Sequence, residues 1–68
     1  MTDHVYKTIE ITGTSSKGVD DAIRVAIEKA SQSVRNLRWF TVTEMRGNIE
    51  GGKVERWQVT MDIGFTLD

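Results

Sequence analysis

The sequence contains no cysteine and no proline, and no long hydrophobic run interrupts it. The absence of cysteine excludes a disulfide framework and thiol catalysis, which is compatible with a reducing cytoplasm. No stretch approaches the roughly 20 apolar residues of a membrane helix, and the first residues lack the apolar core of a secretion signal. We therefore expect a cytoplasmic protein without a membrane partner.

A charge excess of either sign is also missing, because 9 Lys and Arg and 10 Asp and Glu give a formal net charge of −1. General nucleic-acid binders show a basic footprint, so a nucleic-acid partner is not expected. The sequence lacks a glycine-rich phosphate loop, a nucleophile elbow and metal-ligand spacing. The single histidine, His4, lies in the N-terminal segment, a poor place for a positioned catalytic base. We predict neither an enzyme nor a metal site.

The 68 residues have room for one domain, which we place at residues 1–68. A chain of this length buries only about 60 % of its unfolded surface, so its stability is marginal. Disulfides, a structural metal or oligomerisation usually stabilise such small domains. The sequence supports neither of the first two, and we therefore expect self-association.

The hydropathy pattern predicts strand, helix, strand, strand, with the first strand over residues 5–12. The helix is expected from Val19 to about Asn36, with Ser15 or Ser16 as its N-cap. Its apolar positions recur at the three- and four-residue spacing of an amphipathic helix, namely Val19, Ala22, Ile23, Ala26, Ile27, Ala30 and Val34. The predicted fold class is α+β, a βαββ unit in which one helix covers one face of a three-stranded antiparallel sheet.

The second half of the chain is typical of a β-hairpin, because Gly51 and Gly52 supply the positive φ of a primed turn. Glu50 then faces Lys53. Continued along the strands, this register pairs Val42 with Met61, Phe40 with Ile63, Glu44 with Val59 and Met45 with Gln58. The apolar residues that face one another, together with Trp57 and Phe65, are expected to form the core beneath the helix.

The same alternation places Trp39 on the opposite, mostly polar face, across from Gly64, which has no side chain. One helix can cover only one face of the sheet, so an isolated subunit would leave this indole in water. Two interpretations remain open. Trp39 is a subunit-interface residue, a position where Trp is enriched, or it stacks on a planar ligand.

Gln58 lies on the same face, and its amide offers a donor and an acceptor to the edge of a heterocycle. The alternative is an ordinary polar residue on a solvated strand. Along the predicted hairpin Gln58 lies roughly 20 Å from Trp39, at about 3.3 Å per residue. If both residues contact one ligand ring, different chains must contribute them.

The sequence resembles the dodecin family over nearly its whole length. Six segments, in this order and spacing, carry the resemblance: Tyr6-Lys7, Gly13-Thr14-Ser15, Leu37-Arg38-Trp39-Phe40, Arg46-Gly47, Trp57-Gln58-Val59-Thr60 and Ile63-Gly64-Phe65. The resemblance implies a hollow homododecamer of βαββ subunits that holds flavins in pairs at symmetry axes. It further implies storage and sequestration of FMN or riboflavin, with quenching of the flavin by Trp stacking.

By the same resemblance, Trp39 stacks on the isoalloxazine ring and Gln58 hydrogen-bonds it. Arg46 is then a candidate contact to the phosphate of FMN, and Glu44 approaches the polar part of the ligand. The predicted strand parity places Arg46 and Glu44 on the helix side, so both need a bulge, or a position beyond the part of the sheet that the helix covers, to reach the site. Many relatives have a basic residue where this chain has Thr66, which leaves the choice between FMN and riboflavin open.

Some dodecins also bind coenzyme A on their outer surface, so coenzyme A is a further candidate ligand. The alternative to flavin binding is a structural or protein-interaction homo-oligomer in which Trp39 packs against a neighbouring subunit. Yellow colour in the purified protein would distinguish the two.

Overall fold

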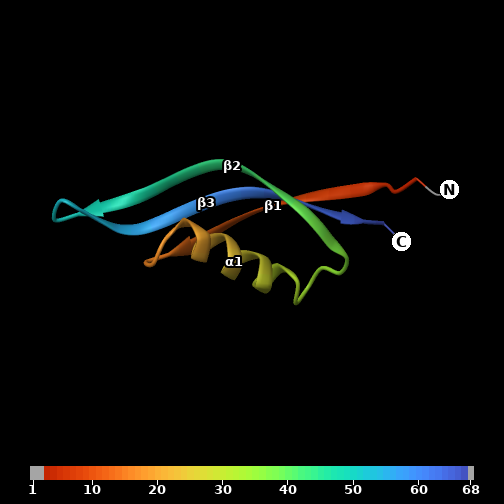
Figure 1. The fold of residues 1–68 in the computed structure, drawn as a ribbon, viewed down its shortest axis with the longest axis horizontal. Helices are drawn as coiled ribbons and strands as arrows, with labels where there is room; N and C mark the ends of the chain where they lie inside the picture. The colour runs from red at the N-terminus through yellow and green to blue at the C-terminus, as the bar shows by residue number, and fades with distance from the viewer. Residues whose placement is uncertain (1–2, 68) are drawn as a thin grey trace.

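The computed structural model describes residues 3–67, which form one sheet and one helix (Figure 1). The elements follow in the order β1 (Tyr6–Ser15), α1 (Val19–Ala30), β2 (Leu37–Glu50) and β3 (Lys53–Thr66). All strand pairs are antiparallel, and β3 lies between β1 and β2. The predicted βαββ fold is confirmed, with β1 running three residues further than the predicted strand.

Helix α1 is shorter than predicted, because it ends at Ala30 and not near Asn36. Two serines lie just beyond this end, and such side chains compete for the backbone groups of a helix end. The hydroxyl of Ser31 donates to the carbonyl of Glu28 at 2.7 Å. Asn36 then adopts a φ of 65°, the left-handed conformation, just before β2 begins. The predicted last turns of the helix are thus a loop that reverses the chain.

The predicted N-cap was also wrong, since the N-cap position is Gly18 and carries no side-chain hydrogen bond. Ser15 is the last residue of β1 and has a different function. Its hydroxyl donates to the carboxylate of Asp21 at 2.7 Å and accepts the backbone N–H of Lys17 at 2.9 Å. Ser15 therefore connects the end of the strand to the first turn of the helix.

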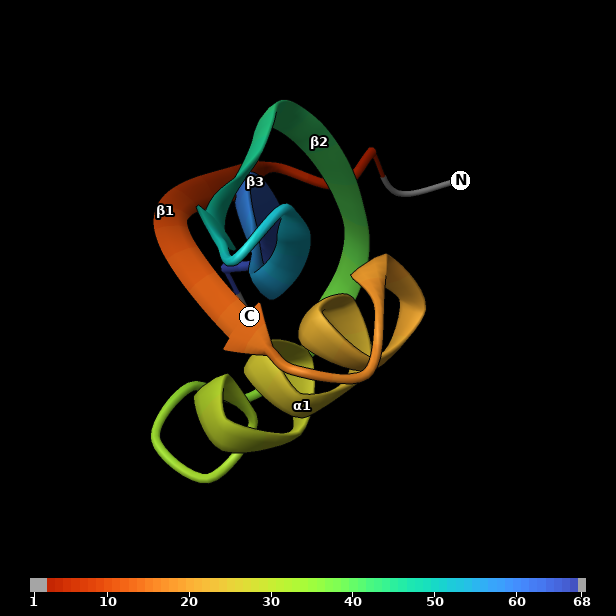
Figure 2. The ribbon, with the colours of Figure 1, turned by 90° about the vertical axis from the view of Figure 1, so that its left-hand side faces the viewer.

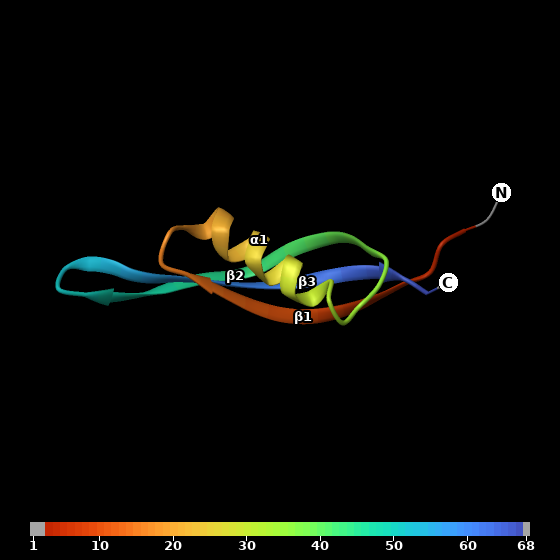
Figure 3. The same cartoon turned by 90° about the horizontal axis from the view of Figure 1, so that it is seen from below.

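The core lies where α1 packs on β1 and β3 (Figures 2 and 3). The apolar side chains that are buried in it are Ala22, Ala26, Val59, Met61 and Ile63. Gly13 of β1 permits the close approach, because a Cβ at this position would overlap the backbone of Ala22 and the side chain of Ala26.

The helix does not cover β2, and this corrects the predicted core. Phe40 is 45 % exposed, and Trp57 and Phe65 are only half-buried. A helix of 12 residues is about 18 Å long at 1.5 Å per residue, whereas the molecule extends over 55 Å. The hairpin formed by β2 and β3 therefore continues well past α1, as the left side of Figure 1 shows.

The predicted primed turn is confirmed, since Gly51 and Gly52 have φ values of 61° and 77° and Glu50 pairs with Lys53. The predicted pairs of Val42 with Met61 and of Phe40 with Ile63 are also present. Within residues 3–67, no helix combines the length and the apolar character that crossing a bilayer requires.

Candidate functional site

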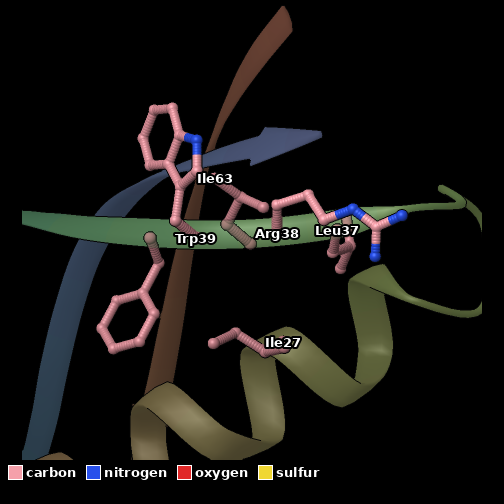
Figure 4. Close-up of a pocket in the computed structure, with 6 residues that line it drawn as sticks. Ile27, Leu37, Arg38, Trp39 and Ile63 are labelled. Carbon is pink, nitrogen blue, oxygen red and sulfur yellow. The ribbon is translucent and has the colours of Figure 1, made fainter. Parts of the chain in front are cut away.

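Trp39 lies on the face of the sheet that α1 leaves open, as its strand parity predicted. Figure 4 shows the indole on one side of β2 and Ile27 of α1 on the other. Trp39 remains 41 % exposed in the single chain. We refer to this open face as the outer face. It carries the side chains that alternate with the core residues along each strand.

Gly64 of β3 is the direct partner of Trp39, again as predicted. A Cβ at Gly64 would overlap the indole ring, so the ring occupies the space that any other residue would fill. The indole consequently rests against the sheet through Gly64, and its opposite side is directed away from the strands. A flat aromatic surface of this kind can stack on a planar partner.

Tyr6 is a neighbour of Trp39 that the sequence reasoning did not assign to the site. The two ring centroids lie 6.1 Å apart with an interplanar angle of 63°, an edge-on contact. His4 extends the row, with its ring centroid 6.3 Å from that of Tyr6. The alternation along β1 could have indicated this, because it places Tyr6 on the outer face. Pairing of Tyr6 with Thr66 then brings it to the end of the sheet where Trp39 lies.

A β-bulge in β2 changes the register that the turn predicted. Thr43 is the extra residue, and its hydroxyl donates to the carbonyl of Thr60 at 3.2 Å. Glu44 therefore pairs with Thr60 and not with Val59. Bulges of this kind re-aim side chains beside functional sites. This bulge turns Glu44 from the predicted helix side to the outer face.

The same bulge corrects the predicted partner of Gln58, which is Arg46 and not Met45. The Nε atom of Arg46 donates to Oε1 of Gln58 at 2.7 Å. Both side chains line a hollow on the outer face with about 500 Å³ of empty space. The structure thus brings Arg46 and Gln58 together, which the sequence-based register did not.

Trp39 remains far from this pair within one chain. Its partner Gly64 and Gln58 are six positions apart on β3, roughly 20 Å at about 3.3 Å per residue. Hydroxyl and carboxylate side chains occupy the strand positions between them. Thr12 and Thr60 share a hydrogen bond at 3.0 Å, and Glu10 pairs with Asp62. The outer face therefore has an aromatic end, a polar middle and a basic end.

These two ends differ in the chemistry that they can support. The aromatic end can stack a planar ring, and the basic end can donate hydrogen bonds to an electron-rich edge or an oxyanion. Over the described part of the chain, no group of three or more His, Cys, Asp or Glu side chains is arranged to hold a metal ion.

The helix side has a separate, apolar hollow of about 330 Å³ at the start of β2 (Figure 4). Ile27, Leu37, Phe40 and Ile63 supply most of its apolar lining, and Arg38 and Trp39 complete the lining. Its position follows from the short helix, which leaves β2 without intrachain cover. The hollow continues the exposed apolar surface of the hairpin, and Figure 4 shows that the indole of Trp39 projects on the other side of β2 from Ile27.

Comparison with known proteins gives a consistent result over nearly the whole chain. The family model described as Dodecin matches residues 5–68. The Dodecin of Thermus thermophilus is 42 % identical over 64 residues, which are 94 % of this chain and 93 % of that protein. The solved structure of dodecin from Streptomyces davaonensis has a TM-score of 0.92 at 51 % identity and 98 % coverage of both chains. The solved structure of dodecin from Streptomyces coelicolor has a TM-score of 0.92 at 50 % identity, and the match covers 100 % of this chain and 97 % of that chain.

Proposed function

Because the chain belongs to the dodecin family, we propose that it binds a flavin, FMN or riboflavin, and stores and sequesters it. The observation that carries the proposal is the Trp39 indole, which lies against Gly64 on an uncovered face. Contact with Gly64 restricts the conformational freedom of the indole, and the side of the ring that is directed away from the strands remains available for stacking. The geometry fits a flat, tricyclic ligand.

The proposed site needs more than one chain. Trp39 and Gln58 are too far apart in one subunit to contact the same ring, so neighbouring copies must supply one of them. The radius of gyration of 14.2 Å also exceeds the value of about 11 Å for a compact domain of this length. The accessible surface of 5143 Å² is larger than the about 4,300 Å² expected for a folded monomer of this mass. We propose that a hollow homododecamer covers this excess surface.

Gln58, Arg46 and Glu44 are the further ligand contacts that we propose. The Gln58 amide hydrogen-bonds the polar edge of the flavin, and its own bond to Arg46 fixes the orientation of the amide. The bulge at Thr43 supports the roles of Arg46 and Glu44, since it turns both toward the outer face. Coenzyme A remains a second candidate ligand of the assembled surface.

The proposed role of Trp39 includes quenching. A bound flavin absorbs blue light and becomes a strong electron acceptor in its excited state. The electron-rich indole in contact with it provides a rapid return to the ground state, so photochemical damage is limited. The side chains around Trp39 are a phenol, hydroxyls and a glycine. We therefore propose binding and sequestration without catalysis by the chain itself.

Titration of the flavin-free assembly with riboflavin, followed by flavin fluorescence, tests the proposal. We expect Trp39→Ala to raise the dissociation constant at least roughly tenfold and to abolish most of the quenching, because the stacking surface is lost. Trp57→Phe is the matched control, since Trp57 lies on the other face and should leave the titration unchanged. Identical curves for Trp39→Ala and the unsubstituted protein would refute the proposal.

One observation favours a second function, that of a structural homo-oligomer without a ligand. The hairpin exposes apolar residues on the helix side, and Ile49 is 79 % exposed. In this alternative, Trp39 packs against a neighbouring subunit and leaves no space for a ring. A purified assembly that is colourless and takes up neither FMN nor riboflavin would favour it.

A further inference from the structure

The basic end of the outer face forms a hollow that all three strands help to build. Its lining consists of Thr14 from β1, Arg46 and Asn48 from β2, and Arg56 and Gln58 from β3. Each of these side chains can donate a hydrogen bond, and two of them carry a permanent positive charge. No carboxylate contributes to the lining among residues 3–67. The chemistry of the hollow is therefore that of an anion site.

Two bulges lie in this part of the hairpin, and the first of them directs the β2 side chains outward. The first, at Thr43, shifts the register before residue 44, and the second restores it after Asn48 by adding a residue to β3. Residues 44–50 thus present the opposite parity from the first part of β2, with Arg46 and Asn48 on the outer face. Gly47 lies between them, and a Cβ there would come within 2.6 Å of the carbonyl oxygen of Arg56. The close approach of the two backbones here requires a residue without a side chain.

The two guanidinium groups lie near one another without a strong counter-charge. Arg46 pairs with Gln58 and Asn48 with Arg56, so the arginines occupy diagonal positions on one face, about 7–8 Å apart at the backbone. Arg46 makes no ion pair among residues 3–67, and its Nε bond to Gln58 leaves the terminal nitrogens available. Arg56 has a long, exposed pair with Glu55 at 3.8 Å, which contributes little. Glu44 and Glu55 flank the hollow but do not line it.

We propose that Arg46 and Arg56, with Thr14 and Asn48, bind a phosphate group in this hollow. The planar forks of the arginines match phosphate oxygens in a bidentate manner, and the hydroxyl and the amide add two donors. A dianionic phosphate also offsets the repulsion between the two like charges. Arg56 is the new ligand in this site. The site itself does not depend on the proposed flavin function, because a free phosphate ester would fit equally. Only the assignment of the phosphate to FMN rests on that function.

Calorimetric titration of the flavin-free assembly with inorganic phosphate, in a buffer without other polyvalent anions, tests the site directly. We expect saturable binding that Arg56→Gln weakens roughly tenfold or more, since a hydrogen bond to a charged group is lost. Arg35→Gln is the control, because it makes the same charge change in the exposed loop after α1. No binding by the unsubstituted protein, or equal weakening by both substitutions, would overturn the proposal.

Comparison of FMN with riboflavin then identifies the source of the phosphate. If the phosphate of FMN occupies the hollow, the ratio of FMN affinity to riboflavin affinity falls in Arg56→Gln. If this ratio is unchanged while inorganic phosphate binding is lost, the site is supported and takes a free phosphate ester. Failure of the flavin proposal would appear separately, as the absence of both flavins from a protein that still binds phosphate.

Discussion

Met61 and Met45 lie on the same side of the sheet and have opposite environments. Met61 is on β3 beneath α1 and is completely buried, whereas Met45 is on β2 past the helix and is 56 % exposed. The difference arises from the helix, which packs on β1 and β3 and does not extend to the part of the hairpin near the turn. The apolar pattern of the strands therefore serves two purposes. One part forms the core of a single chain, and the other supplies surface for contacts between chains.

The largest effect in this comparison is expected from Met61→Ala. It removes a side chain from a core of few residues, and we expect the free energy of unfolding to fall by about 2–5 kcal/mol. Met45→Ala is the matched control and should leave the unfolding of the dissociated chain nearly unchanged. Urea denaturation at low protein concentration measures both. Equal losses would show that the hairpin belongs to the intrachain core.

Gly13→Ala tests how closely the helix must approach β1. The added Cβ would overlap the carbonyl oxygen of Ala22 and the Cβ of Ala26. We expect a loss of about 1–3 kcal/mol, because the helix has to move outward. Gly18→Ala is the control, since a Cβ there has no other atom within 4 Å. A similar thermal midpoint for both variants would contradict the close packing.

Ile49→Asp probes the exposed part of the hairpin, and of these substitutions it should have the smallest effect on the stability of the single chain. Because Ile49 is already exposed, the secondary structure measured by circular dichroism should not change. Association should weaken roughly tenfold or more if neighbours bury this side chain. Native mass measurement over a dilution series, with Gln32→Asp as the control of equal charge, detects this. An unchanged mass distribution would show that the hairpin is not an interface.

Much of this fold could be predicted because local signals determine it. The glycine pair forms the turn that its positive φ values favour, and the alternation from that turn places Trp39 opposite Gly64 on the outer face. The recurrence of apolar residues identified the helix. These features depend on neighbours in sequence, which a pattern records directly.

The features that the sequence did not predict depend on contacts between elements. The apolar period continues to Val34, so the end of α1 at Ala30 is visible only through the serine hydrogen bonds and the reversal at Asn36. Alternation alone cannot reveal a bulge, because Thr43 is a normal strand residue. The placement of Arg46 beside Gln58 could therefore not be predicted, although a bulge was one of the two ways in which Arg46 could reach the site that the resemblance implies. Tyr6 was missed because its proximity to Trp39 arises from the pairing of β1 with β3.

The two bulges in the hairpin compensate one another in the strand register, because the first adds one residue to β2 and the second adds one residue to β3. The first exchanges the inward and outward positions of residues 44–50 of β2, and the second does the same for the residues of β3 next to the turn, so the pairing beside the turn keeps the predicted register. A change in length of one residue between Thr43 and Arg46 would exchange the faces again and move the guanidinium of Arg46 to the apolar side. Replacement of an exposed side chain such as that of Arg46 leaves this pairing of the strands in place. Insertion or deletion of a single residue does not.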